Sequence, residues 1–320
     1  MIRIDLGSEG LARTRFAVSP LHLVCELLYK AGHYPSYLPR TWQSRATTVV
    51  RENRLTLLAA LATAGPVIPD FISPLPTAFD SDPHDQLHQV AITPTDRVDY
   101  EVASVLPDPG RKGTDLSNRS GTLLRRAMDR GEGDFAARVA SQLGQFWDIA
   151  VGPHWTELHD QMHSDISRRA VDSAREGFHQ MINGLGPSFT WNAGSLQLDF
   201  PLCDQSVSLT SQGVILVPSI LGAPDMSCID APEAPGPRIP MITYPVAASP
   251  ARSQNLGDLI GTTRAEILAE LTQPQSTEGL AQRLHLSRAT VSYHLQILHR
   301  AGLLQRTRRS RHVYYQRAAP

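Results

Sequence analysis

Cysteine is scarce in this chain of 320 residues. Only Cys25, Cys203 and Cys228 occur, an odd number at wide separations. A disulfide framework needs several cysteine pairs, and a zinc knuckle needs closely spaced thiolates, so this distribution predicts neither. The sequence therefore excludes a small secreted domain that depends on disulfide bonds.

Long hydrophobic runs are also missing. The start of the chain, Met1–Leu6, lacks the apolar core of a secretory signal. The long uncharged stretches over 177–198 and 205–224 are interrupted by polar residues, glycine and proline, so neither is apolar enough to span a bilayer. We expect no membrane partner and a cytoplasmic location.

The familiar motifs of enzymes and cofactor sites are absent from the sequence. It has no Gly-x-Ser-x-Gly elbow and no P-loop, and Gly131-x-Gly133 lacks the third glycine and the preceding strand of a dinucleotide fingerprint. We therefore expect no catalytic activity and no bound cofactor.

Histidine spacing raises the question of a metal site. His159 and His163 lie four residues apart in a predicted helix with His154 nearby, a spacing that lets two imidazoles share one metal ion. The glutamate that follows the first histidine in a metalloprotease helix is missing. We expect ordinary surface histidines and no metal, and a metal sensor built on these three residues remains the alternative.

What the chain does have is a basic C-terminal segment. Residues 262–320 contain nine Arg and three Glu, a net charge of +6, whereas the whole chain carries −1 and residues 1–261 therefore carry −7. The net charge of the whole chain is near zero although its C-terminal segment is strongly basic. A basic segment of this kind is typical of a protein that binds nucleic acid.

Two short helices are predicted in this segment, over Thr277–Leu284 and Ser287–Arg300. Ser276 and Ser287 are natural N-caps, and only two residues lie between the predicted helices, so the helices must cross. The second helix has an inward apolar stripe of Val291, Leu295 and Leu298. Its outward face near the start has no acid and favours a DNA major groove; this face is formed by Arg288, Ala289, Ser292, Tyr293 and Gln296. A helix-turn-helix that makes only protein contacts is the alternative.

After Gly302 the apolar period falls to about two, which predicts two strands, over 303–308 and 311–317, joined by a turn at Arg309-Ser310. Such a hairpin is the wing of a winged helix. Its basic side chains are predicted to reach phosphates or a minor groove; they are Arg306, Arg308, Arg309, Arg311 and Arg317. We expect the wing to anchor the protein on DNA and the helix to specify the sequence.

The run Ser287-Arg-Ala-Thr-Val-Ser-Tyr-His-Leu-Gln-Ile-Leu-His-Arg-Ala-Gly-Leu-Leu304 resembles the ArsR-like winged-helix family of bacterial transcription regulators. The resemblance covers about the last sixty residues. It implies a homodimer on an inverted repeat of double-stranded DNA, usually a repressor that an inducer releases. The positions that meet DNA in the family are, by resemblance, Ser287, Arg288, Thr290, Ser292, Tyr293 and His294.

The sequence departs from the family in three ways. Residues 277–284 lack the Cys-x-Cys pair of metal-sensing members, no further helix follows the wing, and the wing turn has no glycine. The first departure excludes that metal site. The second means that another segment must form the dimer, and the third leaves the type of turn open.

The N-terminal part begins with strand patterns over Ile2–Leu6 and Arg15–Val18, which suggest a hairpin or paired edge strands. A helix is predicted to start at Ser19-Pro20 and to run over Leu21–Ala31 until Gly32 stops it, and a second is predicted over about 42–64. Five prolines then predict extended or turning chain over 66–83.

Residues 135–185 show helical spacing that is broken near Gly152-Pro153, and residues 188–246 alternate as a small antiparallel sheet does. Large aromatic side chains of these two stretches are candidates to line an effector cavity, although plain core residues are the simpler interpretation: Trp147, Trp155, Phe178 and Trp191.

These patterns together predict an α+β fold. Residues 1–250 form a dimerisation and effector-sensing domain, mostly helical over 19–185 with a small antiparallel sheet over 188–246, and residues 256–320 form a winged helix-turn-helix. The layout resembles regulators in which a large N-terminal domain of unassigned activity precedes an ArsR-like winged helix. We expect a homodimeric, ligand-responsive repressor. An enzyme or metal sensor that uses the winged helix only for DNA targeting is the alternative.

Overall fold

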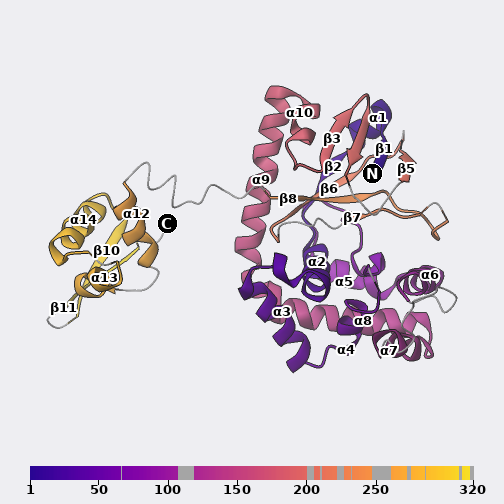
Figure 1. Ribbon diagram of the computed structural model, residues 1–320, viewed down its shortest axis with the longest axis horizontal. Helices are drawn as coiled ribbons and strands as arrows, with labels where there is room; N and C mark the ends of the chain where they lie inside the picture. The colour runs from indigo at the N-terminus through magenta and orange to yellow at the C-terminus, as the bar shows by residue number, and fades with distance from the viewer. Residues whose placement is uncertain are drawn as a thin grey trace. The chain divides into compact units, whose positions relative to one another are not determined.

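A computed structural model describes residues 1–65, 67–106, 119–199, 205–209, 211–221, 227–231, 233–246, 261–271, 275–284, 286–309 and 312–317. The chain divides into two compact units, Met1–Ala247 and Ala248–Pro320, which we call the N-terminal and C-terminal units (Figure 1). Within these ranges no helix is both long enough and apolar enough to cross a membrane.

Helices make up most of the N-terminal unit, and Figure 1 shows α2 to α8 gathered on one side of its strands. The α-helices are α1 (Gly7–Arg13), α2 (Pro20–His33), α3 (Arg40–Glu52), α4 (Thr56–Leu61), α5 (Pro83–Ala91), α6 (Thr95–Val105), α7 (Arg119–Met128), α8 (Glu132–Phe146), α9 (Trp155–Glu176) and α10 (Phe178–Asn183). A π-helical turn (Trp147–Val151) and a 3-10 turn (Gly152–His154) join α8 to α9, and further 3-10 turns are η1 (Pro35–Tyr37) and η2 (Asp70–Ile72).

The described strands of this unit form two mixed sheets. They are β1 (Ile2–Asp5), β2 (Arg15–Phe16), β3 (Phe189–Asn192), β4 (Ser195–Leu198), β5 (Gln205–Ser208), β6 (Ile215–Ser219), β7 (Ser227–Cys228) and β8 (Met241–Pro245). The sheet orders are β3-β4-β1-β5 and β2-β6-β8-β7. β1 runs parallel to β5, and β6 runs parallel to β2 and β8. The prediction of one small antiparallel sheet over 188–246 is therefore wrong, because N-terminal strands enter both sheets.

The predicted N-terminal hairpin is also wrong. Residues 7–13 form the helix α1 between the two strands, and β1 and β2 pair in different sheets. Gly10 makes this packing possible, since a Cβ atom there would lie 2.2 Å from the carbonyl oxygen of Leu209. Each strand gains a buried partner from a distant part of the chain, and a two-stranded ribbon would have offered less burial.

Two helix predictions need correction. The single helix predicted over 42–64 is two helices, α3 and α4, because the chain turns at Arg54, which has a positive φ of 53°. The helix expected to stop at Gly32 runs on to His33, with Ser19 as its N-cap. The helical stretch predicted over 135–185 is present, and its regular α-helix is interrupted around Gly152, as the sequence indicated.

Helix α2 is buried along nearly its whole length, and it carries three buried polar residues at intervals of four. His22 Nδ1 lies 2.9 Å from Ser73 Oγ, and its Nε2 lies 2.6 Å from Thr243 Oγ1 in β8. Burial, together with the charge of Lys30, lowers the pKa of His22 to about 3. One turn further along, Glu26 accepts hydrogen bonds from Lys30 and from Ser219 at the end of β6, so these contacts tie α2 to β6 and β8.

In the described residues of the C-terminal unit, three helices pack with a small sheet. Its elements are α12 (Thr262–Glu270), β9 (Gln275–Ser276), α13 (Thr277–Arg283), α14 (Arg288–Arg300), β10 (Leu304–Arg309) and β11 (His312–Arg317), with the sheet in the order β10-β11-β9. The buried core draws on all three helices and the hairpin; it consists of Ile267, Leu268, Leu271, Leu280, Ala281, Val291, Leu295, Leu298, Leu304 and Tyr315. All residues of this buried cluster come from the C-terminal unit.

Candidate nucleic-acid interface

Two serine caps set the crossing of α13 and α14. Ser276 Oγ accepts from the amide of Gly279 at 3.1 Å, and Ser287 Oγ accepts from the amide of Thr290 at 3.1 Å. Each cap satisfies an amide that the first helical turn leaves free, so both helices begin where the sequence predicted. The amide of Leu286 then donates to Ala281 O at 3.0 Å and closes the turn between the helices.

The predicted apolar stripe fixes which face of α14 points outward. Val291, Leu295 and Leu298 are buried in the core of the unit. Since a helix repeats every 3.6 residues, Ala289, Tyr293 and Gln296 fall on the opposite side of the helix, where they are exposed. The start of α14 therefore presents one continuous outward face.

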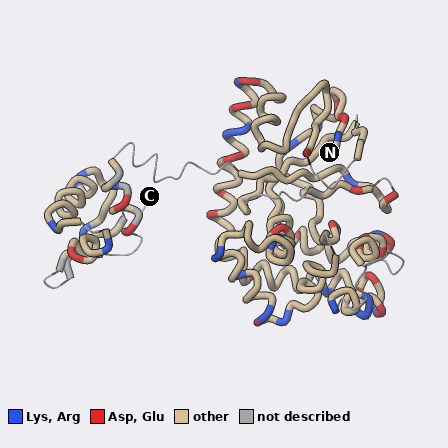
Figure 2. Tube along the Cα trace, in the orientation of Figure 1, with Lys and Arg blue, Asp and Glu red and all other residues tan. Residues whose placement is uncertain are grey.

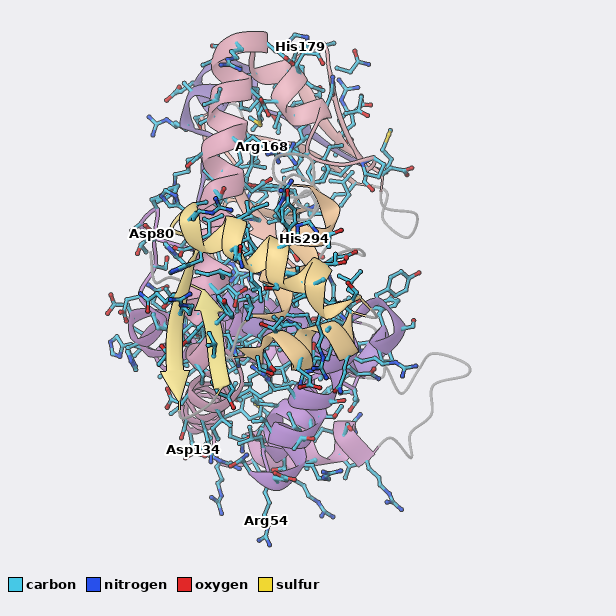
Figure 3. All side chains as sticks on the ribbon, turned by 90° about the vertical axis from the view of Figure 1, so that its left-hand side faces the viewer. Arg54, Asp80, Asp134, Arg168, His179 and His294 are labelled. Atoms are coloured by element: carbon cyan, nitrogen blue, oxygen red, sulfur yellow. The ribbon has the colours of Figure 1, made fainter. Side chains whose placement is uncertain are left out.

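That outward face contains the predicted recognition residues. Arg288 has 71% of its side chain exposed and Tyr293 is 60% exposed. Ser287, Ala289 and Gln296 are also exposed, whereas the predicted contacts Thr290, Ser292 and His294 are partly buried. His294, labelled in Figure 3, lies edge-on to Tyr293 with 5.3 Å between the ring centroids. The exposed side chains are thus those of residues 287–289, 293 and 296.

One acid touches this face, and the sequence reasoning missed it. Arg288 Nη2 contacts Glu278 Oε1, which belongs to the first turn of α13. Figure 2 shows acidic and basic positions together in the C-terminal unit. The absence of acids holds along α14 itself, but the crossing of the helices brings Glu278 to its first turn. No spacing rule predicts a contact between side chains on two crossing helices, which is why the pattern did not reveal it.

A β-hairpin follows α14. Gly302 has a φ of +74°, a conformation that favours glycine, and the amide of Leu303 donates back to Leu298 O at 3.0 Å, so α14 ends there. His299 Nδ1 lies 2.8 Å from Leu304 O and links the end of the helix to β10. β10 and β11 pair antiparallel with Arg309 opposite His312, so Arg309 belongs to the strand and not to the turn as predicted.

The predicted basic contacts of the hairpin are described only in part. Arg306 is exposed in β10. The backbones of Arg308, Arg309 and Arg317 lie in the strands, but their side chains fall outside the described residues, as does the whole of Arg311. Tyr314 and Tyr315 of β11 also pair with Ser276 and Gln275 of β9, which joins the hairpin to the cap of α13.

The four aromatic residues proposed for one effector cavity lie in two separate clusters. Trp147 and Trp155 stand 5.1 Å apart, centroid to centroid, in the larger core, and Phe178 and Trp191 stand 5.5 Å apart in a different one. The two pairs therefore pack with different parts of the core, and a cavity lined by all four stays a prediction. The separation follows from the two-sheet architecture, which puts α10 and β3 with a sheet and the π-helical turn with the helices.

The histidines considered for a metal are engaged elsewhere. His159 Nε2 lies 2.9 Å from Asp80 Oδ1, His154 packs edge-on against Trp42, and His163 packs against Phe79. Within the part of the chain that the structure describes, no three His, Cys, Asp or Glu side chains are grouped to hold a metal ion.

Comparison with known proteins supports the C-terminal geometry. A family model described as a helix-turn-helix domain matches residues 262–307, which span α12, α13, α14 and most of β10. Neither the curated proteins nor the solved structures give a match. The C-terminal unit contains a helix-turn-helix domain. This supports DNA binding by that unit and, with it, a role in transcription regulation.

Helix α12 and strand β9 belong to that domain, yet the sequence reasoning did not predict either. The spacing of Ile267, Leu268 and Leu271 was a usable helical signal, and all three are buried in the domain core. β9 has only two residues, too few for a period of two to be detected.

Proposed function

We propose that the protein is a sequence-specific transcription regulator whose C-terminal unit binds double-stranded DNA as an ArsR-like winged helix. The observation that carries this proposal is the outward face of α14, where Arg288, Tyr293 and Gln296 are exposed on a helix whose start is fixed by the Ser287 cap. Hydrogen-bonding and aromatic side chains at the start of a second helix suit the base edges of a major groove.

The hairpin β10–β11 is assigned the role of the wing. Arg306 is exposed on β10, and further arginines of the predicted set follow it in sequence at 308, 309 and 311. Arginine reaches phosphates and narrow minor grooves at a large electrostatic gain and with little base information. The hairpin would therefore contribute affinity for any DNA duplex, and α14 would contribute the preference for a particular base sequence.

The protein would act as a homodimer on an inverted repeat and repress transcription until a ligand binds. Two copies of α14 then meet half-sites about 34 Å apart, one helical turn of DNA. We assign dimerisation and ligand sensing to the N-terminal unit. A ligand that binds better to a dimer in which the two copies of α14 are differently spaced would shift the dimer population to a conformation that does not fit the DNA half-sites.

We further propose that the N-terminal unit is a sensor and not an enzyme. Both ring nitrogens of the buried His22 are engaged, by Ser73 and Thr243, and only 1% of the residue is exposed, so this histidine is not available as a catalytic base. A histidine so placed has no access to a substrate. Assay of the purified protein for hydrolysis of simple phosphate and acyl esters tests this assignment, and turnover above the rate of an unrelated control protein would contradict it.

The DNA-binding proposal is tested by a mobility shift with the duplex upstream of the protein's own gene, in excess random DNA and across a salt series. We expect a discrete complex that survives the competitor. Binding that depends on salt without preference for the upstream sequence, or no binding, would refute sequence-specific regulation.

The dimer is tested independently of the operator. Analytical ultracentrifugation at micromolar concentration should give the mass of two chains, and the complex with DNA should hold two chains per duplex. A single chain in both measurements would rule out the dimeric mechanism.

A further inference from the structure

A pocket of about 380 Å³ opens in the N-terminal unit, and all of its lining residues belong to that unit. It lies between the start of α3, the first turns of α9 and the residue that follows β6. Its lining includes Trp42, Arg45, His154, Glu157, Leu158 and Ile220. The volume is within the range of pockets that hold small molecules.

The position of the pocket in the fold favours a ligand. Ile220 follows the carboxyl end of β6, which is flanked by the parallel strands β2 and β8. In open sheets with parallel strands, ligands bind beyond the carboxyl ends of the strands. The π-helical turn Trp147–Val151 also adjoins the pocket through Arg45, and such turns occur frequently at functional sites.

Arg45 is the charged group that defines the chemistry of the pocket. Its Nη1 donates to Ala150 O in the π-helical turn at 3.3 Å, and its Cζ lies 5.0 Å from the centroid of the Trp42 ring. These two contacts hold the guanidinium in place, and neither of them is with a counter-ion. Among the ion pairs formed by residues that the structure describes, none includes Arg45.

The rest of the lining is partly apolar and partly polar. Leu158 is buried, and Trp42 and Ile220 are partly buried. His154 meets Trp42 edge-on at 5.8 Å and braces that ring against movement. Glu157, exposed at the rim, disfavours a ligand with two negative charges.

We propose that this pocket binds a small organic monocarboxylate with an apolar body. The carboxylate accepts hydrogen bonds from the guanidinium of Arg45, and the apolar body packs against Trp42, Leu158 and Ile220. Charge-assisted bonds from arginine to a carboxylate are among the stronger polar contacts in proteins. This inference rests on the proposed function, because it assigns the effector site of the regulator and the chemical class of the effector.

The test uses the full chain and three probes, benzoate, phenylacetate and indole-3-acetate, each compared with its neutral amide. Binding is measured by ligand-observed NMR and isothermal titration calorimetry. We expect each carboxylate to bind at least about tenfold more tightly than its amide, because only the carboxylate pairs with Arg45.

Two variants locate the binding in this pocket. Arg45→Gln is expected to lower the affinity for the carboxylates about tenfold or more and to leave the weak amide binding unchanged, whereas Glu157→Gln is expected to raise carboxylate affinity by removing a like charge. Arg51→Gln is the matched control, since Arg51 lies on the same helix with 75% of its side chain exposed, and it should bind as the parent does. Thermal melts verify that each variant is folded.

The proposal would be overturned if none of the three carboxylates bound at millimolar concentration. It would also be overturned if the parent and Arg45→Gln bound the carboxylates with equal affinity. The mobility shift described above separates this failure from that of the proposed function. If the protein binds its operator but none of the probes, only the pocket assignment is wrong. If it binds the probes but shows no preference for the operator, the proposed regulatory function is wrong and the pocket assignment stands.

Discussion

Single residues of the C-terminal unit are expected to differ in what they contribute to DNA binding. Arg288 stands in the first turn of α14, with its guanidinium directed by contact with Glu278, whereas Arg306 stands on an exposed strand. A directed guanidinium suits bidentate recognition of a base, and an undirected one suits attraction to phosphate.

We therefore predict different losses for two arginine variants. Arg288→Ala should weaken operator binding by about 1–3 kcal/mol and relax base preference, whereas Arg306→Ala should weaken binding to all duplexes alike and lower the salt slope by about one unit. Fluorescence anisotropy on operator and random duplexes across a salt series measures both effects. Equal losses for the two variants on both duplexes would contradict this division of roles.

His22 supplies a prediction about pH at the same scale. Burial lowers its folded-state pKa to about 3, from an ordinary value of 6.5. Below pH 6.5 the unfolded chain takes up a proton at His22 while the folded chain stays neutral down to about pH 3. The stability that neutral His22 contributes is thus present above pH 6.5 and is lost as the pH falls toward 3, at up to about 1.4 kcal/mol per pH unit.

His22→Gln should therefore flatten the fall in stability on acidification between pH 6.5 and 3, because glutamine does not titrate. Urea unfolding at a series of pH values measures the slope for the parent and the variant. The variant is expected to be less stable at pH 7, so the test compares the slope of the unfolding free energy against pH and not the absolute stability. An unchanged slope would show that His22 does not stay neutral in the folded chain.

At the scale of elements, the start of α14 depends on one side chain. Ser287 accepts from the amide of Thr290, and its hydroxyl also lies 2.8 Å from the Thr290 hydroxyl. The amides of the first turn have no partner within the helix. Arg288 lies in the same helical turn, so loss of the Ser287 cap is expected to disturb the backbone that positions the proposed base contact.

Ser287→Ala is predicted to destabilise the C-terminal unit by about 1 kcal/mol and to weaken operator binding, whereas Ser287→Asn should retain most of the stability because asparagine also caps helices. Chemical unfolding followed by far-UV circular dichroism measures the stability, and anisotropy measures the binding. If the alanine and asparagine variants were equally stable, Ser287 would not act as the cap.

The helix pair, its caps and the hairpin were predictable because their determinants are close in sequence. Ser276, Ser287 and Gly302 each act within six residues through backbone hydrogen bonds, and the stripe Val291, Leu295 and Leu298 needs only the helical period. The division of 42–64 into α3 and α4 was not predictable in this way, since the apolar spacing continues across the turn at Arg54.

At the scale of the whole molecule, each unit has its own core. Among the described residues, the buried cluster of the C-terminal unit consists of residues from 267 onward, and the fully buried residues of the N-terminal clusters end at 244. The two units also differ in charge, because residues 262–320 carry +6 and the remainder of the chain −7. We therefore predict that the C-terminal unit folds without the N-terminal core.

A fragment of residues 256–320 is predicted to fold cooperatively, to remain monomeric, and to bind the operator about 100-fold more weakly or worse than the full chain, because it loses the second linked half-site. Calorimetry, ultracentrifugation and anisotropy measure the three properties. A fragment that dimerises and binds with full affinity would move the dimer interface into the C-terminal unit.

The sequence by itself determined the C-terminal helix-turn-helix, because local spacing, caps and charge all act within about sixty neighbouring residues. It also determined that α9 is separated from α8 near Gly152. Only the tertiary structure decided the rest. β1 pairs with β4, which follows it by 190 residues or more, the four aromatic side chains fall into two clusters, and Glu278 reaches Arg288. His154 likewise reaches Trp42, more than 100 residues away in the sequence, only through the tertiary fold. Contacts between distant segments depend on which surfaces the folded chain buries together, and no local pattern encodes that choice.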